Sequence, residues 1–319
     1  MIPPADGQGR AVVVALGGNA LSGPGEEGDV YSQFAHTRKS LAPIVALAQD
    51  GWRIAVVHGN GPQIGDELRR HELARGERPM FPLGVLVAST AGWIGYMIQQ
   101  SLQNALRRAG VKRHTVTLIT QVLVEPPPVG MEPIKPIGRS LDEEEALRLR
   151  EALGWTVAER DGKWRRLAPS PVPIGIVERD EIRRLVDDGV IVIAAGGGGT
   201  PAYREPDGTF EGVDAVVDKD RAAQVLADEI GASVLLIVTN VDGVYADYGT
   251  PDERLVERLT VAEALDMLDS GALGSGSMAP KVEAAVAFVA GGTGRRAHIA
   301  ALDKGLDAVN GRAGTVIVE

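Results

Sequence analysis

The segment Ala11-Val12-Val13-Val14-Ala15-Leu16-Gly17-Gly18-Asn19 decides the fold. Its first six residues form an apolar run, and such a run, bounded by glycines, predicts a short buried strand. The segment 53–58, followed by Gly59-Asn60-Gly61-Pro62, repeats the pattern. The two segments therefore predict two strands that each end in a glycine-rich loop.

Sequence patterns of strands and helices alternate along the rest of the chain. Further strands are predicted at residues 115–120, 190–195, 234–239, 297–301 and 315–318, and helices at 34–49, 84–108, 179–188, 221–230, 261–268 and 280–290. This alternation is typical of an α/β fold with a mainly parallel sheet covered on both faces. Ligands of such folds bind at the carboxyl ends of the strands, where the glycine-rich loops 17–19, 59–61 and 196–199 lie.

One stretch, residues 125–173, interrupts this alternation with prolines, an acidic run at 142–145 and a polar hairpin pattern at 159–166. We interpret it as an inserted subdomain that protrudes from the edge of the sheet. A long surface excursion without a role is the alternative for most of its length. With this insertion, residues 1–319 are expected to form a single domain.

Composition excludes several classes of protein. The 33 basic and 43 acidic residues leave a net charge of −10, so no basic footprint for nucleic acid is expected. The chain has no cysteine, which excludes disulfides, thiolate nucleophiles and Fe–S clusters. Residues 1–10 do not resemble a signal peptide, and no apolar run reaches the roughly 18 residues of a membrane span. These features predict a cytoplasmic protein without a membrane partner.

Lysine is rare, at 7 residues against 26 arginines, and three lysines lie in rigid motifs. Lys135 precedes a proline, Lys219 stands between Asp218 and Asp220, and Lys281 follows a proline. Phosphoryl transfer needs compact positive charges near the moving group, which an ammonium supplies better than a planar guanidinium. A surface salt bridge is the alternative for each lysine alone. Asp218 also fits a helix N-cap.

The sequence matches none of the familiar nucleotide-binding or metal-binding motifs. The spacing of glycines after residue 58 does not match the dinucleotide fingerprint, and residues 274–281 lack the second glycine and the hydroxyl residue of a P-loop. No histidine pair has metal-ligand spacing, and His58 can be an ordinary residue at a strand end. The segment Thr239-Asn240-Val241-Asp242-Gly243-Val244-Tyr245 suits either part of a purine pocket or a plain turn with a packed tyrosine.

In this order, the motifs resemble those of the amino acid kinase superfamily, and most closely those of its carbamate kinase family. The resemblance extends from Ala11 to Val318, and nine motifs in sequence are far more specific than any one of them. They are ALGGNAL (15–21), HGNGPQ (58–63), ITQV (119–122), KPIG (135–138), PSP (169–171), AGGGG (195–199), VDKD (217–220), VDGVY (241–245) and GSMAPK (276–281).

The resemblance implies a three-layer αβα sandwich, assembled as a homodimer, that acts as an ATP-dependent kinase. The reaction would be reversible phosphoryl transfer between ATP and carbamate, giving ADP and carbamoyl phosphate, and would belong to arginine metabolism. Mg²⁺ would be carried by the phosphates of ATP or ADP, without protein metal ligands. No general base is required, because carbamate is already an oxyanion.

The resemblance also implies roles for residues at matching positions. Lys219 and Lys281 would neutralise phosphate charge, Asp220 would orient both, and Lys135 would reach in from the subdomain. The carbamate and the transferred phosphoryl group would be held by Gly17, Gly18, Asn19, Gly59, Asn60 and Gly61. The nucleotide would be surrounded by Gly196, Gly197, Gly198, Gly199, Asn240, Asp242, Tyr245 and Met278.

The chain departs from the family pattern at Gly84, where Asp is common, at Ala91, where Gln is common, and at Arg139-Ser140, where Pro and a bulky residue are common. A kinase of the same fold acting on another small carboxylate, and a nucleotide sensor without activity, are therefore the alternatives. A dehydrogenase is disfavoured by the failed dinucleotide spacing.

Overall fold

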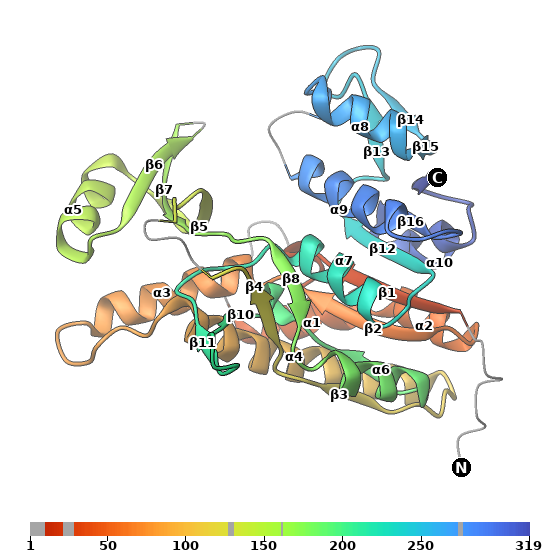
Figure 1. Ribbon diagram of the computed structural model, residues 1–319, viewed down its shortest axis with the longest axis horizontal. Helices are drawn as coiled ribbons and strands as arrows, with labels where there is room; N and C mark the ends of the chain where they lie inside the picture. The colour runs from red at the N-terminus through yellow and green to blue at the C-terminus, as the bar shows by residue number, and fades with distance from the viewer. Residues whose placement is uncertain (1–9, 22–28, 127–130, 161, 274–276) are drawn as a thin grey trace.

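The computed structural model describes residues 10–21, 29–126, 131–160, 162–273 and 277–319, and its centre is one large sheet (Figure 1). In the described part this sheet has eight strands, in the order β15-β17-β16-β12-β1-β2-β9-β3. In that order they span Arg258–Thr260, Thr315–Val318, Arg296–Ala301, Val234–Thr239, Ala11–Leu16, Arg53–His58, Ile191–Ile193 and Thr115–Thr117. All neighbours pair in parallel except β16 and β17, which are antiparallel. The prediction of a mainly parallel sheet is confirmed.

Both faces of the sheet are covered, because alternate residues of its strands enter two different cores. In β1, Val13 and Ala15 belong to one core, whereas Val12 and Val14 belong to the other. The first core is covered by α6 (Arg179–Asp187), α7 (Lys219–Glu229), α8 (Val261–Asp269) and α9 (Met278–Ala290). The second is covered by α1 (Val30–Ser40), α2 (Ala42–Gln49), α4 (Leu83–Arg108) and α10 (Gly305–Val309). These layers form the expected αβα sandwich.

A second, smaller sheet lies beside α7. It has the order β11-β10-β4-β8, with strands Phe210–Gly212, Thr200–Arg204, Gln121–Val124 and Pro173–Ile176. Val122, Val124 and Ile176 of this sheet share a core with Leu226 of α7. The expected strand 115–120 is shorter than predicted: β3 ends at Thr117, and after residues 118–120 the chain enters this second sheet at Gln121.

The segment between β4 and β8 forms a third sheet that extends away from the central one (Figure 1). It contains β5 (Lys135–Leu141), α5 (Glu143–Leu153), β6 (Thr156–Arg160) and β7 (Lys163–Ala168), in the strand order β5-β7-β6. The predicted hairpin is confirmed, since β6 and β7 pair in antiparallel fashion. Leu141, Leu149 and Trp155 give this part a small core of its own. Strand β5 packs on α3 (Gly61–Ala74).

Two other expected boundaries are wrong for local reasons. The helix predicted at 34–49 is two helices, because Pro43 lies in the first turn of α2. Proline has no N–H and so cannot donate the hydrogen bond that would continue a preceding helix. The strand predicted at 190–195 ends at Ile193, because Ala195 has a left-handed backbone with φ of 48°. Among the described residues, no helix is long and apolar enough to cross a membrane.

Candidate active site

The loops after β1 and β2 lie side by side. The parallel register pairs Leu16 with His58, so both strands end at the same level. The N–H of Gly59 donates to the carbonyl of Leu16 at 3.0 Å, and a Cβ at Gly59 would lie 3.6 Å from the nitrogen of Gly18. Two backbone segments approach each other closely here because neither residue has a side chain. The side chain of Asn19 lies outside the described part of the chain.

The start of α7 carries a lysine between two aspartates. Asp218 caps the helix: its Oδ1 accepts hydrogen bonds from the N–H groups of Asp220 at 2.9 Å and Arg221 at 3.4 Å. This cap fixes the first turn, and Lys219 and Asp220 follow it directly. The N-cap prediction for Asp218 is confirmed.

Asp220 joins two lysines from different helices. Its Oδ1 lies 2.5 Å from Nζ of Lys219, and its Oδ2 lies 3.0 Å from Nζ of Lys281, which is on α9. The side chain of Asp220 is 4% exposed and that of Lys281 is 10% exposed. Burial lowers the pKa of Lys281, and the nearby charge of Lys219 lowers it further, whereas the Asp220 carboxylate opposes both effects. The two ammonium groups are therefore held close together by one buried carboxylate.

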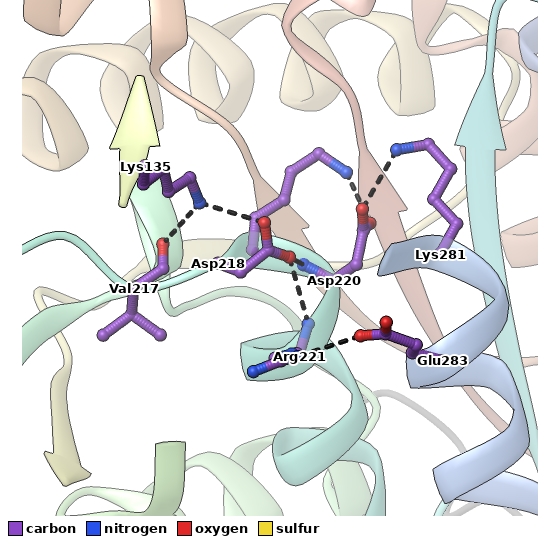
Figure 2. Close-up of polar contacts among 8 residues, drawn as sticks. Lys135, Val217, Asp218, Asp220, Arg221, Lys281 and Glu283 are labelled. Atoms are coloured by element: carbon purple, nitrogen blue, oxygen red, sulfur yellow. Dashed lines mark hydrogen bonds and ion pairs between the residues drawn. The ribbon is translucent and has the colours of Figure 1, made fainter. Parts of the chain in front are cut away.

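Lys135 reaches the same region from β5 of the third sheet. Its Nζ lies 2.9 Å from Oδ2 of Asp218 and 3.5 Å from the carbonyl of Val217. Figure 2 shows Lys135 and Lys281 approaching Asp218 and Asp220 from two sides. Although burial opposes its ionisation, Asp218 has a lowered pKa because the ammonium groups of Lys135 and Lys219 stabilise its negative charge.

The glycines 196–198 form a short 3-10 helix (η2) between β9 and β10. This helix packs closely against the other loops. Gly198 has φ of 92°, and a Cβ there would lie 2.2 Å from the carbonyl of Val217. A Cβ at Gly197 would lie 2.5 Å from Nδ2 of Asn60. The Asn60 amide in turn donates to Oγ1 of Thr90 on α4 at 2.9 Å. The run of glycines is therefore required by close packing.

One cavity of about 630 Å³ connects these features. The predicted residues that line it are Gly18, Gly59, Asn60, Gly61, Lys135, Gly197, Lys219, Asp220 and Lys281. Its lining combines lysine ammonium groups with glycines, whose backbone is not covered by side chains. This combination suits the oxygens of a phosphate group. The arrangement can thus bind an anionic group and neutralise charge that develops on it.

The other predicted residues are not among those that line the cavity. Gly17 precedes the short helix η1 (Gly18–Ala20), and Gly196, Gly198 and Gly199 are buried behind Gly197 or lead into β10. Beyond the end of β12, Asn240 and Asp242 are exposed, and Tyr245 lies on the hairpin of β13 (Val244–Ala246) and β14 (Arg254–Val256). Met278 begins α9.

A model of the amino acid kinase family matches residues 10–301. The chain belongs to the amino acid kinase family. It is 43% identical over 314 residues to a carbamate kinase of Pyrococcus furiosus, covering 97% of this chain and 99% of that protein. A carbamate kinase of Clostridium perfringens is 39% identical, with 97% and 99% covered. The structure of a Giardia lamblia carbamate kinase bound to AMP-PNP has a TM-score of 0.89 and 38% identity, with 98% and 99% covered.

The positions that depart from the carbamate kinase pattern lie on α4 and on β5. Gly84 is buried at the start of α4, where a Cβ would lie 3.3 Å from the carbonyl of Val213. Ala91 lies on the same helix beside Gly196. On β5, Arg139 forms an ion pair with Glu145, and this pairing lowers the pKa of the Glu145 carboxyl.

Sequence reasoning missed part of the lining. Arg165 on β7 lines the cavity, together with Pro136, Ile137, Gly138, Ile64, Val216, Val217, Ser277 and Pro280. The hairpin pattern placed Arg165 on a strand but did not show that β7 pairs with β5, which carries Lys135. Pairing between distant segments depends on tertiary packing, so no local signal marked this arginine.

The described side chains do not form a site in which the protein itself would bind a metal ion. In the described ranges, no group of three or more His, Asp or Glu side chains could hold a metal ion. Both oxygens of Asp220 and Oδ2 of Asp218 face lysine ammonium groups. These residues fit a Mg²⁺ ion that arrives on nucleotide phosphates better than one bound by carboxylates of the chain.

Proposed function

We infer that the chain is a carbamate kinase, which transfers a phosphoryl group reversibly between ATP and carbamate. The observation that carries this proposal is the Lys219–Asp220–Lys281 cluster, which faces the same cavity as the glycine-rich loops after β1 and β2. The similarity to carbamate kinases over 97% of the chain supports the choice of acceptor.

The two lysines of the cluster would act on the moving phosphoryl group. Their ammonium groups neutralise charge on its oxygens, and Asp220 keeps both in place without a reorganisation cost during transfer. Lys135 would add a third positive charge from the third sheet, which makes the position of β5 part of the site. Carbamate attacks as an oxyanion, so the site needs no proton acceptor.

Nucleotide binding is assigned to the C-terminal half. The residues that would surround the nucleotide are Gly196, Gly197, Gly198, Gly199, Asn240, Asp242, Tyr245 and Met278. Mg²⁺ bound to the nucleotide phosphates would supply further charge neutralisation. Gly17, Gly18, Asn19, Gly59, Asn60 and Gly61 would hold the carbamate side.

Three broader expectations accompany this proposal: a homodimer, a cytoplasmic location and a role in arginine metabolism. The relatives support the reaction, and these three statements remain predictions. Light scattering on the purified chain would measure the mass of the assembly and so test the dimer.

The reaction is tested by coupled detection of ATP formed from MgADP and carbamoyl phosphate. Turnover is expected for the wild-type protein, and Lys219→Ala should lose it, because the buried carboxylate then holds one ammonium instead of two. No turnover above that of the Lys219→Ala variant would refute the proposal. Binding of ADP without turnover would indicate a sensor instead.

A further inference from the structure

His58 is a buried histidine immediately before the loop Gly59–Gly61, and its two ring nitrogens have different surroundings. Nδ1 lies 3.0 Å from the carbonyl oxygen of Gly59. Nε2 has no hydrogen-bond partner among the described residues and faces Gly196, where a Cβ would lie only 2.5 Å away. The ring is fully buried, and this burial lowers the pKa of His58 to about 4.

These surroundings select one tautomer. A carbonyl oxygen accepts hydrogen bonds and cannot donate, so the short contact requires the proton on Nδ1. Nε2 then carries a lone pair, which avoids a buried N–H without an acceptor beside Gly196. A neutral ring protonated at Nδ1 satisfies both contacts.

The hydrogen bond to Gly59 also orients the next amide. All described peptide bonds are trans, so the carbonyl of Gly59 and the N–H of Asn60, which share one peptide plane, point in opposite directions. His58 is buried and is not among the described lining residues, whereas Gly59 and Asn60 line the cavity. Holding the carbonyl toward His58 therefore turns the N–H of Asn60 toward the cavity.

That N–H is available to a ligand. Within the part of the chain that the structure describes, it donates to no protein acceptor, whereas the N–H of Gly59 is used by Leu16. The Asn60 side chain is held separately by Thr90, and the stem of Lys219 packs against Gly59. The free amide thus lies on a loop that contacts one of the two clustered lysines.

We propose that His58, as the neutral Nδ1–H tautomer, is a positioning residue for phosphoryl transfer. It acts through the Gly59 carbonyl and aims the N–H of Asn60 at an oxygen of the transferred group. This inference rests on the proposed function for its kinetic consequence, but the tautomer is a property of the free protein.

Three substitutions separate this role from simple packing. In His58→Asn, the side-chain amide nitrogen can occupy the place of Nδ1 and donate to Gly59. In His58→Gln it is displaced toward the place of Nε2, and His58→Leu keeps bulk without a donor. We expect kcat to fall on the order of 100-fold in the Leu and Gln variants, as for loss of one oriented donor, with KM for ADP nearly unchanged. The Asn variant should regain most of kcat.

His298 supplies the matched control. It is also buried, on β16, its pKa is also lowered to about 4 by burial, and neither ring nitrogen has a partner among the described residues. His298→Leu should keep the wild-type kcat, because His298 lies on β16 and is not among the described residues that line the cavity. Equal loss of kcat in His298→Leu and His58→Leu would overturn the positioning role, as would a His58→Asn variant as slow as His58→Leu.

The tautomer is measured directly on the wild-type chain by ¹⁵N NMR of labelled histidines, with the His58 signals assigned by their loss in His58→Asn. A protonated Nδ1 and an unprotonated Nε2 at pH 7 are expected. The reverse tautomer, or a protonated ring, would overturn the proposal even if His58→Leu or His58→Gln fails to fold. Lack of wild-type turnover would refute the proposed function instead, and the nitrogen signals would still decide the tautomer.

Discussion

Asp220→Asn is the substitution that most strongly probes the lysine cluster. The wild-type carboxylate contacts Nζ of Lys219 at 2.5 Å and Nζ of Lys281 at 3.0 Å, and it is almost completely buried. An asparagine keeps the shape but removes the charge, leaving two buried ammonium groups without a shared counterion. Removing one partner of a buried ion pair costs about 3–5 kcal/mol.

This cost translates into a measurable change in thermal stability. The chain has 319 residues, and unfolding gains about 2.1 cal/mol/K of entropy per residue. A loss of 1 kcal/mol in the free energy of unfolding therefore lowers the Tm by about 1.5 °C. The Tm of Asp220→Asn should therefore fall by about 4–8 °C, measured by calorimetry without ligands. The kcat for ATP formation should fall about 100-fold or more, because the lysines lose their fixed positions.

Glu283→Gln is the matched control. Glu283 pairs with Arg221 at 2.8 Å and joins the same two helices, α7 and α9 (Figure 2). Both of these side chains are exposed. Its loss should cost less than about 1 kcal/mol and leave kcat unchanged. A wild-type Tm and kcat in Asp220→Asn would contradict this role of Asp220, as would a loss of Tm and kcat in Glu283→Gln as large as that in Asp220→Asn.

Three further predictions concern single features of the site and core. Lys281→Arg should lower kcat at least about 100-fold, because a planar guanidinium does not fit beside the buried Asp220; near-normal turnover in the coupled assay would contradict this. Gly198→Ala should lose more than about 2 kcal/mol in urea unfolding, from its positive φ and the contact with Val217, whereas Gly212→Ala, with open space around it, should lose little. Because the pKa values of buried His58 and His298 are lowered from 6.5 to about 4, the folded state binds fewer protons than the unfolded state. The free energy of unfolding should thus fall as the pH falls from about 6.5 to about 4, by about 3 kcal/mol per histidine, and a smaller fall is expected for His298→Leu.

The central sheet was predictable because its signals are local. Residues 11–16 and 54–57 are apolar runs bounded by glycine or polar residues, and the predicted strands 11–16 and 53–58 become β1 and β2 with those same limits. Part of the lysine cluster could also be predicted from the sequence, since Asp218 and Asp220 flank Lys219 within one helical turn. Lys281 was identified from its motif, although the distance to Asp220 depends on packing between α7 and α9.

The remainder depends on contacts between distant segments. Strands β4, β8, β10 and β11 are only three to five residues long. β4 pairs with β8 and with β10, which lie far from it in the sequence, and no local periodicity indicates such pairs. The partnership of Asn60 with Thr90 is similar, because Thr90 lies inside a predicted helix without a distinguishing pattern. The role inferred for His58 required the direction of each ring nitrogen, which a sequence does not contain.

The most direct test of the central claim compares phosphoryl donors in one assay. Purified wild-type chain is given MgADP with either carbamoyl phosphate or acetyl phosphate, and ATP formation is followed, with Asp220→Asn as the impaired reference. We expect rapid ATP formation from carbamoyl phosphate, much slower formation from acetyl phosphate and strong impairment in the variant. Equal or faster use of acetyl phosphate, or no ATP from carbamoyl phosphate, would contradict it.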